Sequence, residues 1–172
     1  MSAPHPQIAA FLANVPSVIP ANGVVGYVIG DTWRGPADQW AAYTATPRTS
    51  NARYGESAHS RGIVGEWQGA AVDVFPILEN GSVSNDPAHY RPYAELAAVH
   101  GLQNLGEMYG SDWSHNQVPG HKSLPTLPID ESAWRQVGNG WEPITGGGLL
   151  ATNAGTGALL VGLGALLWMI DK

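Results

Sequence analysis

The sequence predicts an α+β domain that is followed by one C-terminal transmembrane helix. Helix-like and strand-like patterns, separated by glycine and proline, alternate along residues 1–141. After a glycine-rich linker at 142–148, residues 149–170 form an apolar run without a charged side chain. Only 13% of all residues are charged, which agrees with a segment that avoids water.

The first half of the domain predicts three elements. Residues 6–14 have the spacing of a short amphipathic helix, and residues 23–29 have the composition of a strand. Residues 36–43 predict a helix with proline in its first turn. None of these three segments carries an obvious reactive group.

The second half contains the polar candidates. A loop at 44–61, rich in Thr, Ser, Arg and Asn, leads toward a clear strand at 70–78. Residues 92–105 predict a helix that starts with proline and ends near a glycine. Residues 119–141 are proline-rich and predict irregular structure that wraps the domain.

The run at 149–170 predicts a lipid bilayer as a partner. About 20 apolar residues span the ~30 Å hydrocarbon core of a membrane, so the run suits a single crossing. Small residues recur at small-xxx-small spacing, as Ala151 with Gly155 and Ala158 with Gly162, which would let two helices pack as a homo-oligomer. A buried or disordered Gly/Ala-rich tail is the alternative.

Composition excludes two classes of chemistry. The net charge is -6 and the eight Lys and Arg residues form no basic run, so nucleic acid is not expected as a partner. The chain has no cysteine, so it has neither disulfides nor thiolate ligands. Any metal ion must therefore be held by histidine and carboxylate side chains.

Asp73 is the first candidate for a functional side chain, because it interrupts the apolar strand at 70–78. A buried carboxylate costs several kcal/mol unless it is paired or bound to a metal ion. A metal ion is one such partner. A salt bridge with Arg61 or Arg48 is the other.

Two histidines can join Asp73. His59 lies in a loop whose glycines permit a hairpin that returns the chain to Asp73. Asp112 precedes His115 with spacing that sets the two side chains together in a turn, one to bind a metal ion and one to hold water. A solvated histidine and a simple Asp–His hydrogen bond are the ordinary alternatives. Three ligands and a base are what a zinc hydrolase needs.

Four short motifs stand in a fixed order along the chain: Thr46-Pro47-Arg48-Thr49-Ser50, Ser57-Ala58-His59-Ser60-Arg61-Gly62, Gly69-Ala70-Ala71-Val72-Asp73 and Asp112-Trp113-Ser114-His115. This order resembles the zinc peptidases of bacterial cell-wall peptides, which include D-Ala-D-Ala carboxypeptidases and the L-alanyl-D-glutamate endopeptidases of phage endolysins. Their signature is SxHxxGxAxD, followed by a carboxylate, two residues and a histidine. Residues 63–69 are an insertion in that signature. The resemblance covers residues 23–117, the motif core. It does not extend to the proline-rich segment at 118–141, which is expected to wrap the domain.

The resemblance implies a role for each matching residue. His59, Asp73 and His115 would bind one Zn²⁺ ion, and Asp112 would be the general base. Arg48 would stabilise the oxyanion or bind a substrate carboxylate. The resemblance also implies a hedgehog-like fold, in which a small antiparallel sheet with flanking helices carries the zinc site.

Some assignments stay open. His121 is an alternative third metal ligand, although no carboxylate stands at the corresponding position before it. Arg53 or Arg61 could replace Arg48, since all three flank the first histidine motif. Among the seven tryptophans, Trp113 lies beside the expected base and is the candidate for substrate contact.

The sequence and the resemblance together lead to one expected function. The chain is expected to hydrolyse peptide bonds in peptidoglycan stem peptides with zinc, as an endolysin-like or virion-associated lysin. The segment at 149–170 would anchor it in a bacterial inner membrane or a phage virion membrane. The alternatives are a non-catalytic, membrane-anchored protein of the cell wall or virion that retains the fold, and a domain with a structural zinc site.

Overall fold

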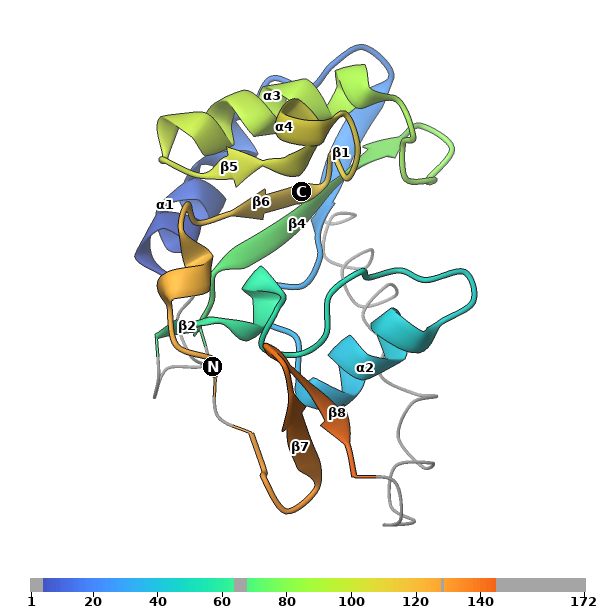
Figure 1. The fold of residues 1–172 in the computed structure, drawn as a ribbon. Coiled ribbons are helices and arrows are strands. Elements are labelled where there is room, and N and C mark those ends of the chain that lie inside the picture. Colours follow the sequence, from blue (N-terminus) through green and yellow to red (C-terminus); the bar gives the residue numbers. More distant parts are fainter. Residues whose placement is uncertain (1–4, 64–67, 128, 145–172) are drawn as a thin grey trace, which may run out of the picture.

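The computed structural model describes residues 5–63, 68–127 and 129–144, and it confirms a mixed α+β domain with a small antiparallel sheet and flanking helices (Figure 1). The helices and short 3-10 turns are α1 (Pro6–Asn14), η1 (Val15–Ser17), α2 (Pro36–Thr44), η2 (Ala58–Ser60), α3 (Pro87–Val99), α4 (Leu105–Tyr109) and η3 (His121–Ser123). The strands are β1 (Val24–Ile29), β2 (Gly62–Ile63), β3 (Gln68–Gly69), β4 (Ala71–Leu78), β5 (Gln103–Asn104), β6 (His115–Gln117), β7 (Trp134–Val137) and β8 (Gly140–Pro143).

The main sheet has the strand order β1-β4-β6-β5, and its pairs are antiparallel. β4 therefore lies in the interior of the sheet, with β1 on one side and β6 on the other. The register places Asp73 directly opposite His115. Two residues that are far apart in the sequence thus become cross-strand neighbours, whose side chains share one face of the sheet.

The two faces of β4 have different chemistry. Side chains alternate along a strand, so Val72 and Val74 point to one face and Asp73 points to the other. Val72 and Val74 join the buried core, which also contains residues of α1, η1 and α3: Ile8, Phe11, Val15, Tyr93 and Ala97. The opposite face is left for the polar group around Asp73. This alternation is why a carboxylate can stand in an apolar strand without entering the core.

The insertion at 63–69 leaves the sheet undisturbed, because its two ends meet. β2 and β3 pair antiparallel, with Gly62 opposite Gly69. The Ala70 N–H donates to the carbonyls of both Ala58 and Arg61, at 2.9 and 2.7 Å. The two described ends of this segment therefore lie side by side. This confirms that the segment returns the chain so that His59 can meet Asp73.

Gly69 is required at this return point. A Cβ atom there would collide with the Thr32 carbonyl oxygen and would stand 2.9 Å from the His59 carbonyl oxygen. We expect Gly69→Ala to lower the free energy of unfolding by about 1–3 kcal/mol, the usual effect of overpacking. Gly26→Ala is the matched control, since a Cβ atom at Gly26 meets nothing within 4 Å. Equal thermal unfolding midpoints for the two variants would contradict the packing argument.

Two expected elements differ from the structure. The helix predicted at 92–105 is α3, which begins at Pro87 and ends at Val99. The Asp86 side chain accepts a hydrogen bond from the Ala88 N–H at 2.9 Å and so caps the helix earlier, leaving Pro92 inside it. The prediction took the wrong proline as the helix start.

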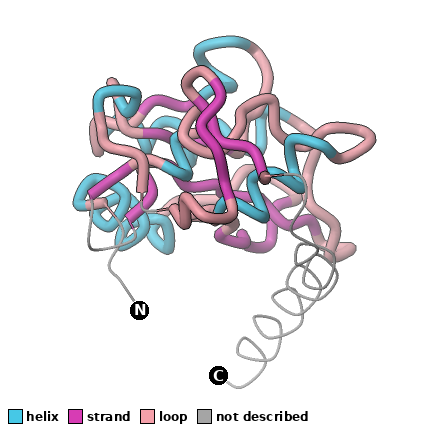
Figure 2. The backbone as a smooth tube through the Cα atoms, turned by 60° about the horizontal axis from the view of Figure 1, so that its bottom comes forward, coloured by secondary structure: helices cyan, strands magenta, loops and turns pink. Residues whose placement is uncertain are grey.

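The stretch at 119–141 is less irregular than predicted. It contains η3 and most of a β7–β8 hairpin, whose turn includes Gly138 at a φ of 62°. The hairpin continues to Pro143, into the stretch expected to be linker. It lies away from α3 and α4 in Figure 1 and comes forward in Figure 2.

This hairpin packs on the polar loop that contains the first histidine motif. Tyr54 is buried there, donates its hydroxyl to the Leu127 carbonyl at 3.1 Å and pairs through its backbone with Trp141. Burial raises the pKa of Tyr54 to about 12, although a hydrogen bond involving Trp33 opposes the rise. The C-terminal part of the domain thus supports the loop that carries His59.

No helix in residues 5–63, 68–127 and 129–144 is long and apolar enough to cross a membrane. The predicted transmembrane segment at 149–170 lies outside the described residues.

Candidate metal centre

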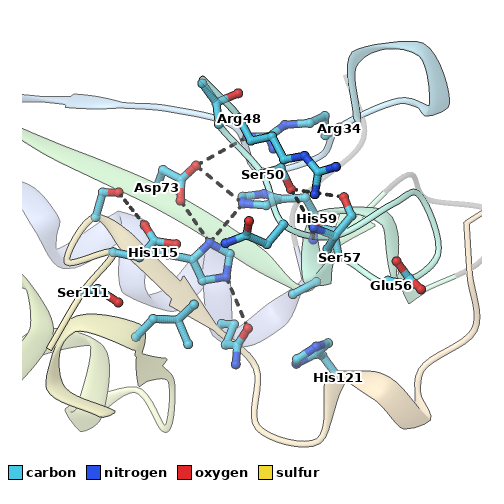
Figure 3. Close-up of a pocket in the computed structure, with 18 of the residues that line it drawn as sticks. Arg34, Arg48, Ser50, Glu56, Ser57, His59, Asp73, Ser111, His115 and His121 are labelled. Atoms are coloured by element: carbon cyan, nitrogen blue, oxygen red, sulfur yellow. Dashed lines mark hydrogen bonds and ion pairs between the residues drawn. The ribbon is translucent and has the colours of Figure 1, made fainter. Parts of the chain in front are cut away.

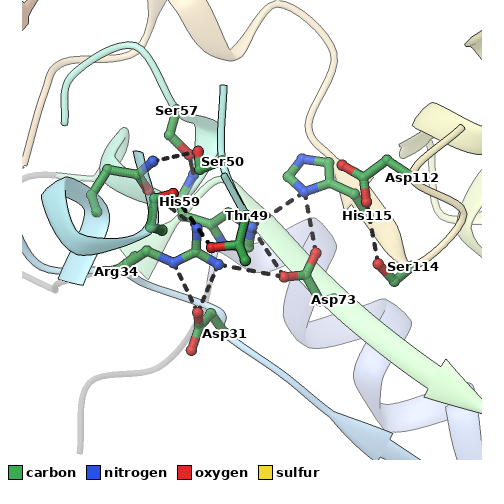
Figure 4. A network of polar contacts seen from close by, with 12 residues as sticks. Asp31, Arg34, Thr49, Ser50, Ser57, His59, Asp73, Asp112, Ser114 and His115 are labelled. Atoms are coloured by element: carbon green, nitrogen blue, oxygen red, sulfur yellow. Dashed lines mark hydrogen bonds and ion pairs between the residues drawn. The ribbon is translucent and has the colours of Figure 1, made fainter. Parts of the chain in front are cut away.

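Three side chains from three elements converge on one point: His59 from η2, Asp73 from β4 and His115 from β6 (Figures 3 and 4). One ligand atom from each lies within 4.8 Å of the others. All three residues are buried, with 2% to 8% of their surface exposed. The group could therefore bind a metal ion, as the sequence predicts.

The candidate ligand atoms lie at distances comparable with those around one metal ion, and the two histidines face different oxygens of Asp73. His59 Nε2 lies 3.2 Å from His115 Nδ1 and 3.5 Å from Asp73 Oδ2, and His115 Nδ1 lies 3.2 Å from Asp73 Oδ1. Ligand atoms about 2.0–2.1 Å from a tetrahedral zinc ion stand roughly 3.3 Å apart. The two imidazole rings meet edge to face at 80°, with one nitrogen of each ring in the 3.2 Å contact. The residues present fit a single metal ion.

His59 is held by the 3-10 turn that carries it. The Ser57 hydroxyl accepts from the His59 N–H at 3.3 Å and caps the turn. The Ser60 hydroxyl donates to the Ser57 carbonyl and accepts from the Gly55 N–H, both at 2.8 Å. These bonds explain the serines on either side of the histidine, because they fix the turn from both ends.

His115 has an outer partner that orients its ring. Its Nε2 lies 3.2 Å from Gln117 Oε1, an oxygen that can accept a hydrogen bond from the ring, and its Nδ1 faces Asp73 and His59. With a metal ion bound, Nε2 would carry the ring proton and Nδ1 would be the ligand atom. Metal-binding histidines commonly donate their second ring nitrogen in this way. The Nδ1 of His59, in contrast, is buried without a hydrogen bond to any residue that the structure describes.

The electrostatics of the group favour a cation at its centre. Burial by itself raises the pKa of Asp73, but hydrogen bonds from His115 and His59 and their charges hold the pKa well below its ordinary value. Burial likewise lowers the pKa of His115, but Asp73 outweighs it and raises that pKa, with a smaller contribution from Asp112. An ionised carboxylate between two imidazoles requires a positive charge, which a proton or a metal ion can supply.

Arg34 is a residue of this site that the sequence analysis missed. Its Nη2 lies 3.8 Å from Asp73 Oδ2 and 2.8 Å from Asp31 Oδ2, and its backbone N–H donates to the His59 carbonyl at 3.2 Å. The predicted salt-bridge partners of Asp73 were Arg61 and Arg48, but Arg34 makes this contact. The signal available in the sequence was that Arg34 follows soon after the strand predicted at 23–29.

The other arginines separate into two groups. Arg48 is exposed, lines the cavity in front of the metal group and stacks over Tyr43, with its Cζ 4.6 Å from the ring centroid. Arg53 pairs with Glu56 at 2.9 Å. Arg61 donates to the carbonyls of Gly55, Lys122 and Leu124. Of the three arginines considered from sequence, Arg48 alone lines the metal cavity.

Asp112 lies on the wall of the metal cavity, beside His115 (Figure 4). It is exposed and stands on the side of His115 away from Arg34 (Figure 4). Its backbone adopts the left-handed conformation with a φ of 59°, and its Oδ1 accepts from the Ser114 hydroxyl at 3.3 Å. Aspartate tolerates this conformation better than most residues. The tight turn brings a carboxylate to the cavity next to a ligand candidate.

Two other candidates lie farther from the centre. His121 lines the cavity but does not belong to the three-residue group, and burial and the charges of Lys122 and His115 lower its pKa. Trp113 packs on Gly106 of α4, where a Cβ atom would clash with its ring. Trp113 is not among the side chains that line the cavity.

The cavity itself has a volume of about 690 Å³. Basic side chains on its wall, Arg34 and Arg48, lie near the acidic Asp73 and Asp112. Ligand sites of several hundred Å³ accept small molecules or short peptide segments. The arrangement can hold a metal ion, a base and a substrate together.

A buried amide network holds the turn that carries Asp112 and His115. The Asn104 Nδ2 donates to the Trp113 carbonyl at 2.9 Å, the His115 carbonyl at 3.3 Å and Asn116 Oδ1 at 3.0 Å. Its Oδ1 accepts from the Glu107 N–H at 3.1 Å and caps α4. Asn104 thus ties the start of this helix to the end of the following turn.

We expect Asn104→Asp to destabilise the protein and weaken metal binding. The variant would lose the donor and leave buried acceptors unpaired, at a cost of about 1–3 kcal/mol each. Gln103→Glu is the control, because Gln103 lies on the opposite face of the same short strand. Thermal unfolding and a zinc titration would measure both effects. A metal affinity that both variants retain equally would contradict a positioning role for Asn104.

Comparison with known proteins gives no match, either to a family model or to a curated protein.

Proposed function

We propose that the chain is a zinc-dependent peptidase that cleaves peptide bonds in peptidoglycan stem peptides. The observation that carries this proposal is the buried group of His59, Asp73 and His115, whose ligand atoms lie within 4.8 Å of one another on the wall of a large cavity. Two imidazoles and one carboxylate are a donor set that suits zinc. The three side chains line the cavity, which is where a catalytic zinc ion would hold its open position.

Three residues that line the cavity, Asp112, Arg48 and Arg34, have a part in this proposal. When bound, the ion would supply Lewis-acid chemistry and lower the pKa of a water molecule toward about 7. Asp112 accepts the proton from the attacking water and later delivers it to the leaving amine. Arg48 orients a substrate carbonyl or carboxylate with its forked donors. Arg34 holds the Asp73 carboxylate in place.

The substrate class rests on the sequence resemblance rather than on the cavity. The four motifs occur in the order found in zinc peptidases of cell-wall peptides, and the structure brings the matching residues together despite the insertion at 63–69. The geometry supports a metal site beside a cavity. The resemblance alone favours a peptide substrate over other hydrolysable groups.

Mass spectrometry of purified peptidoglycan treated with the full chain in mild detergent tests this function. We expect new peptide ends that disappear with a chelator and return when zinc is restored. The position of these ends would identify the scissile bond. A folded, zinc-loaded protein that releases no peptide fragments would refute the peptidase proposal.

The same measurement addresses a second candidate, a non-catalytic cell-wall or virion protein. The observation that favours it is that Asp73 already has three cationic or polar partners in His59, His115 and Arg34. Such a group can be stable as a network of charged side chains without a metal ion. Peptidoglycan binding without hydrolysis would support this candidate. Loss of folding on chelation without hydrolysis would instead indicate a structural zinc site.

We also propose that residues 149–170 anchor the protein in a bacterial inner membrane or a phage virion membrane. The support is the length of the uncharged run. Fractionation of expressing cells tests the anchor, which is expected to require detergent for extraction. Recovery of the full chain in the soluble fraction without detergent would refute it.

A further inference from the structure

A second hollow adjoins the metal cavity. It has a volume of about 550 Å³ and is lined by Asn51, Ala52, Glu56, Arg61, Lys122 and Asn139. Asn51, Ala52 and Glu56 also line the metal cavity, so the two hollows share a wall. Figure 3 places Glu56 apart from Asp73 and His115. A ligand that fills one hollow can therefore continue into the other.

The second hollow is polar and positively charged. Apart from Ala52, its lining side chains are polar or charged. Glu56 forms a pair with Arg53 at 2.9 Å, and the hydrogen bond from Arg53 lowers the pKa of Glu56 against the effect of burial. This pair is internally neutral. The second hollow then keeps the positive charges of Arg61 and Lys122.

The two cations have different properties. Arg61 is held by hydrogen bonds from Nη1 to the carbonyls of Lys122 and Leu124, at 2.9 and 2.8 Å. Lys122 is exposed, and in the part of the chain that the structure describes it forms no ion pair with a carboxylate. Arg61, which is fixed by hydrogen bonds, and Lys122, which is exposed, line the same hollow. Together they suit an incoming anion.

The concentration of positive charge is unusual for this chain. Its net charge is -6, yet four of its eight Lys and Arg residues line the two hollows: Arg34, Arg48, Arg61 and Lys122. Glu56, Asp73 and Asp112 line the same hollows, so the excess of positive charge lies at Arg61 and Lys122 in the second hollow, where an anionic group would be attracted.

We propose that the second hollow is a substrate subsite in which Lys122, beside Arg61, binds a free carboxylate of a peptide that extends beyond the bond at the metal centre. This inference rests on the proposed peptidase function, because that function supplies the peptide. It favours a substrate that continues past the metal cavity over a short one that ends within it. The subsite would orient an acidic peptide without touching the reacting atoms.

Paired peptides test the subsite. The probes are soluble stem peptides in which one free carboxylate at a time is replaced by an amide. The proteins are the full chain, Lys122→Ala, Lys122→Glu and Arg135→Ala. Arg135 is the matched control because it is an exposed cation on β7 that pairs with Glu142 outside both hollows. Both kcat/KM and the calorimetric Kd are measured.

We expect Lys122→Ala to weaken binding of the acidic peptide about three- to five-fold, as for an exposed ion pair, and Lys122→Glu to weaken it further. One amidated peptide should lose the same factor with wild-type protein and be insensitive to either change at Lys122. Arg135→Ala should leave both peptides unaffected. Equal effects of Lys122 substitution on acidic and amidated peptides, or no effect, would overturn the subsite.

Cleavage, measured as kcat/KM, and binding, measured as the calorimetric Kd, separate the subsite from the peptidase proposal. Binding that depends on Lys122, without cleavage, would keep the subsite and refute the peptidase. Cleavage that ignores Lys122 would keep the peptidase and refute the subsite. Neither binding nor cleavage of any probe would refute both.

Discussion

Replacing His115 by alanine is expected to abolish tight zinc binding by the full chain. The change removes one of three converging ligands and leaves Asp73 and His59 without the third. Loss of an outer-shell partner alone commonly weakens metal binding 10- to 100-fold, so loss of a direct ligand should exceed about 100-fold. Isothermal titration with zinc and the metal content of the purified protein would measure the loss.

The same variant should also lose the stabilisation that zinc provides. At a free zinc concentration 100 times the Kd, binding adds about 2.7 kcal/mol to the free energy of unfolding of the wild-type protein. For a protein of this size, that corresponds to an increase of roughly 5–10 °C in the unfolding midpoint. The His115→Ala protein should show no such increase.

His121→Ala is the matched control for this experiment. His121 lines the cavity but lies outside the three-residue group, so its removal should leave zinc affinity close to that of the wild-type protein. The reverse result, with zinc retained by His115→Ala and lost by His121→Ala, would assign the third ligand to His121.

The metal group could be predicted because its signals are local. Asp73 interrupts an apolar strand, and that interruption alone requires a cationic partner. His115 follows Asp112 closely enough for the two side chains to share a turn. The structure confirms that His59, Asp73 and His115 meet, and the strand register explains how Asp73 and His115 become neighbours. Register depends on the whole sheet, and the sequence could only indicate that the meeting was feasible.

Arg34 was missed because its function depends on tertiary neighbours. In the sequence it is an ordinary residue after a strand, with no motif around it. Only the pairing of β1 with β4 brings it to Asp73, while Arg61, which belongs to the first histidine motif, is turned toward three backbone carbonyls. The nearest arginine in sequence was therefore a poor guide to the nearest in space.

The errors in secondary structure have a similar cause. The helix start was assigned to Pro92, although Asp86 and Pro87 form a capped start more than one turn earlier. The β7–β8 hairpin was overlooked because its strands are short and flanked by a proline-rich segment. Both cases show that proline marks a boundary only together with the capping and pairing groups around it.

Replacing Asp112 by asparagine is expected to remove hydrolysis while leaving zinc bound. Asparagine keeps the size of the side chain and tolerates the left-handed backbone at this position, so the turn should be preserved. It cannot accept the proton of the attacking water, and general-base catalysis contributes about 10²- to 10⁴-fold to such reactions. A fall of kcat by that factor, with unchanged zinc affinity, would place Asp112 in the chemical step.

Asp38→Asn provides the control for that change, since Asp38 is an exposed carboxylate in the first turn of α2 and does not line the metal cavity. It makes the same change in net charge without touching the proposed base. Full turnover by Asp112→Asn would show that another group takes the proton. Loss of zinc from the same variant would instead make Asp112 a metal ligand or its support. The two failures point to different chemistry, so metal content and turnover must be measured on the same preparation.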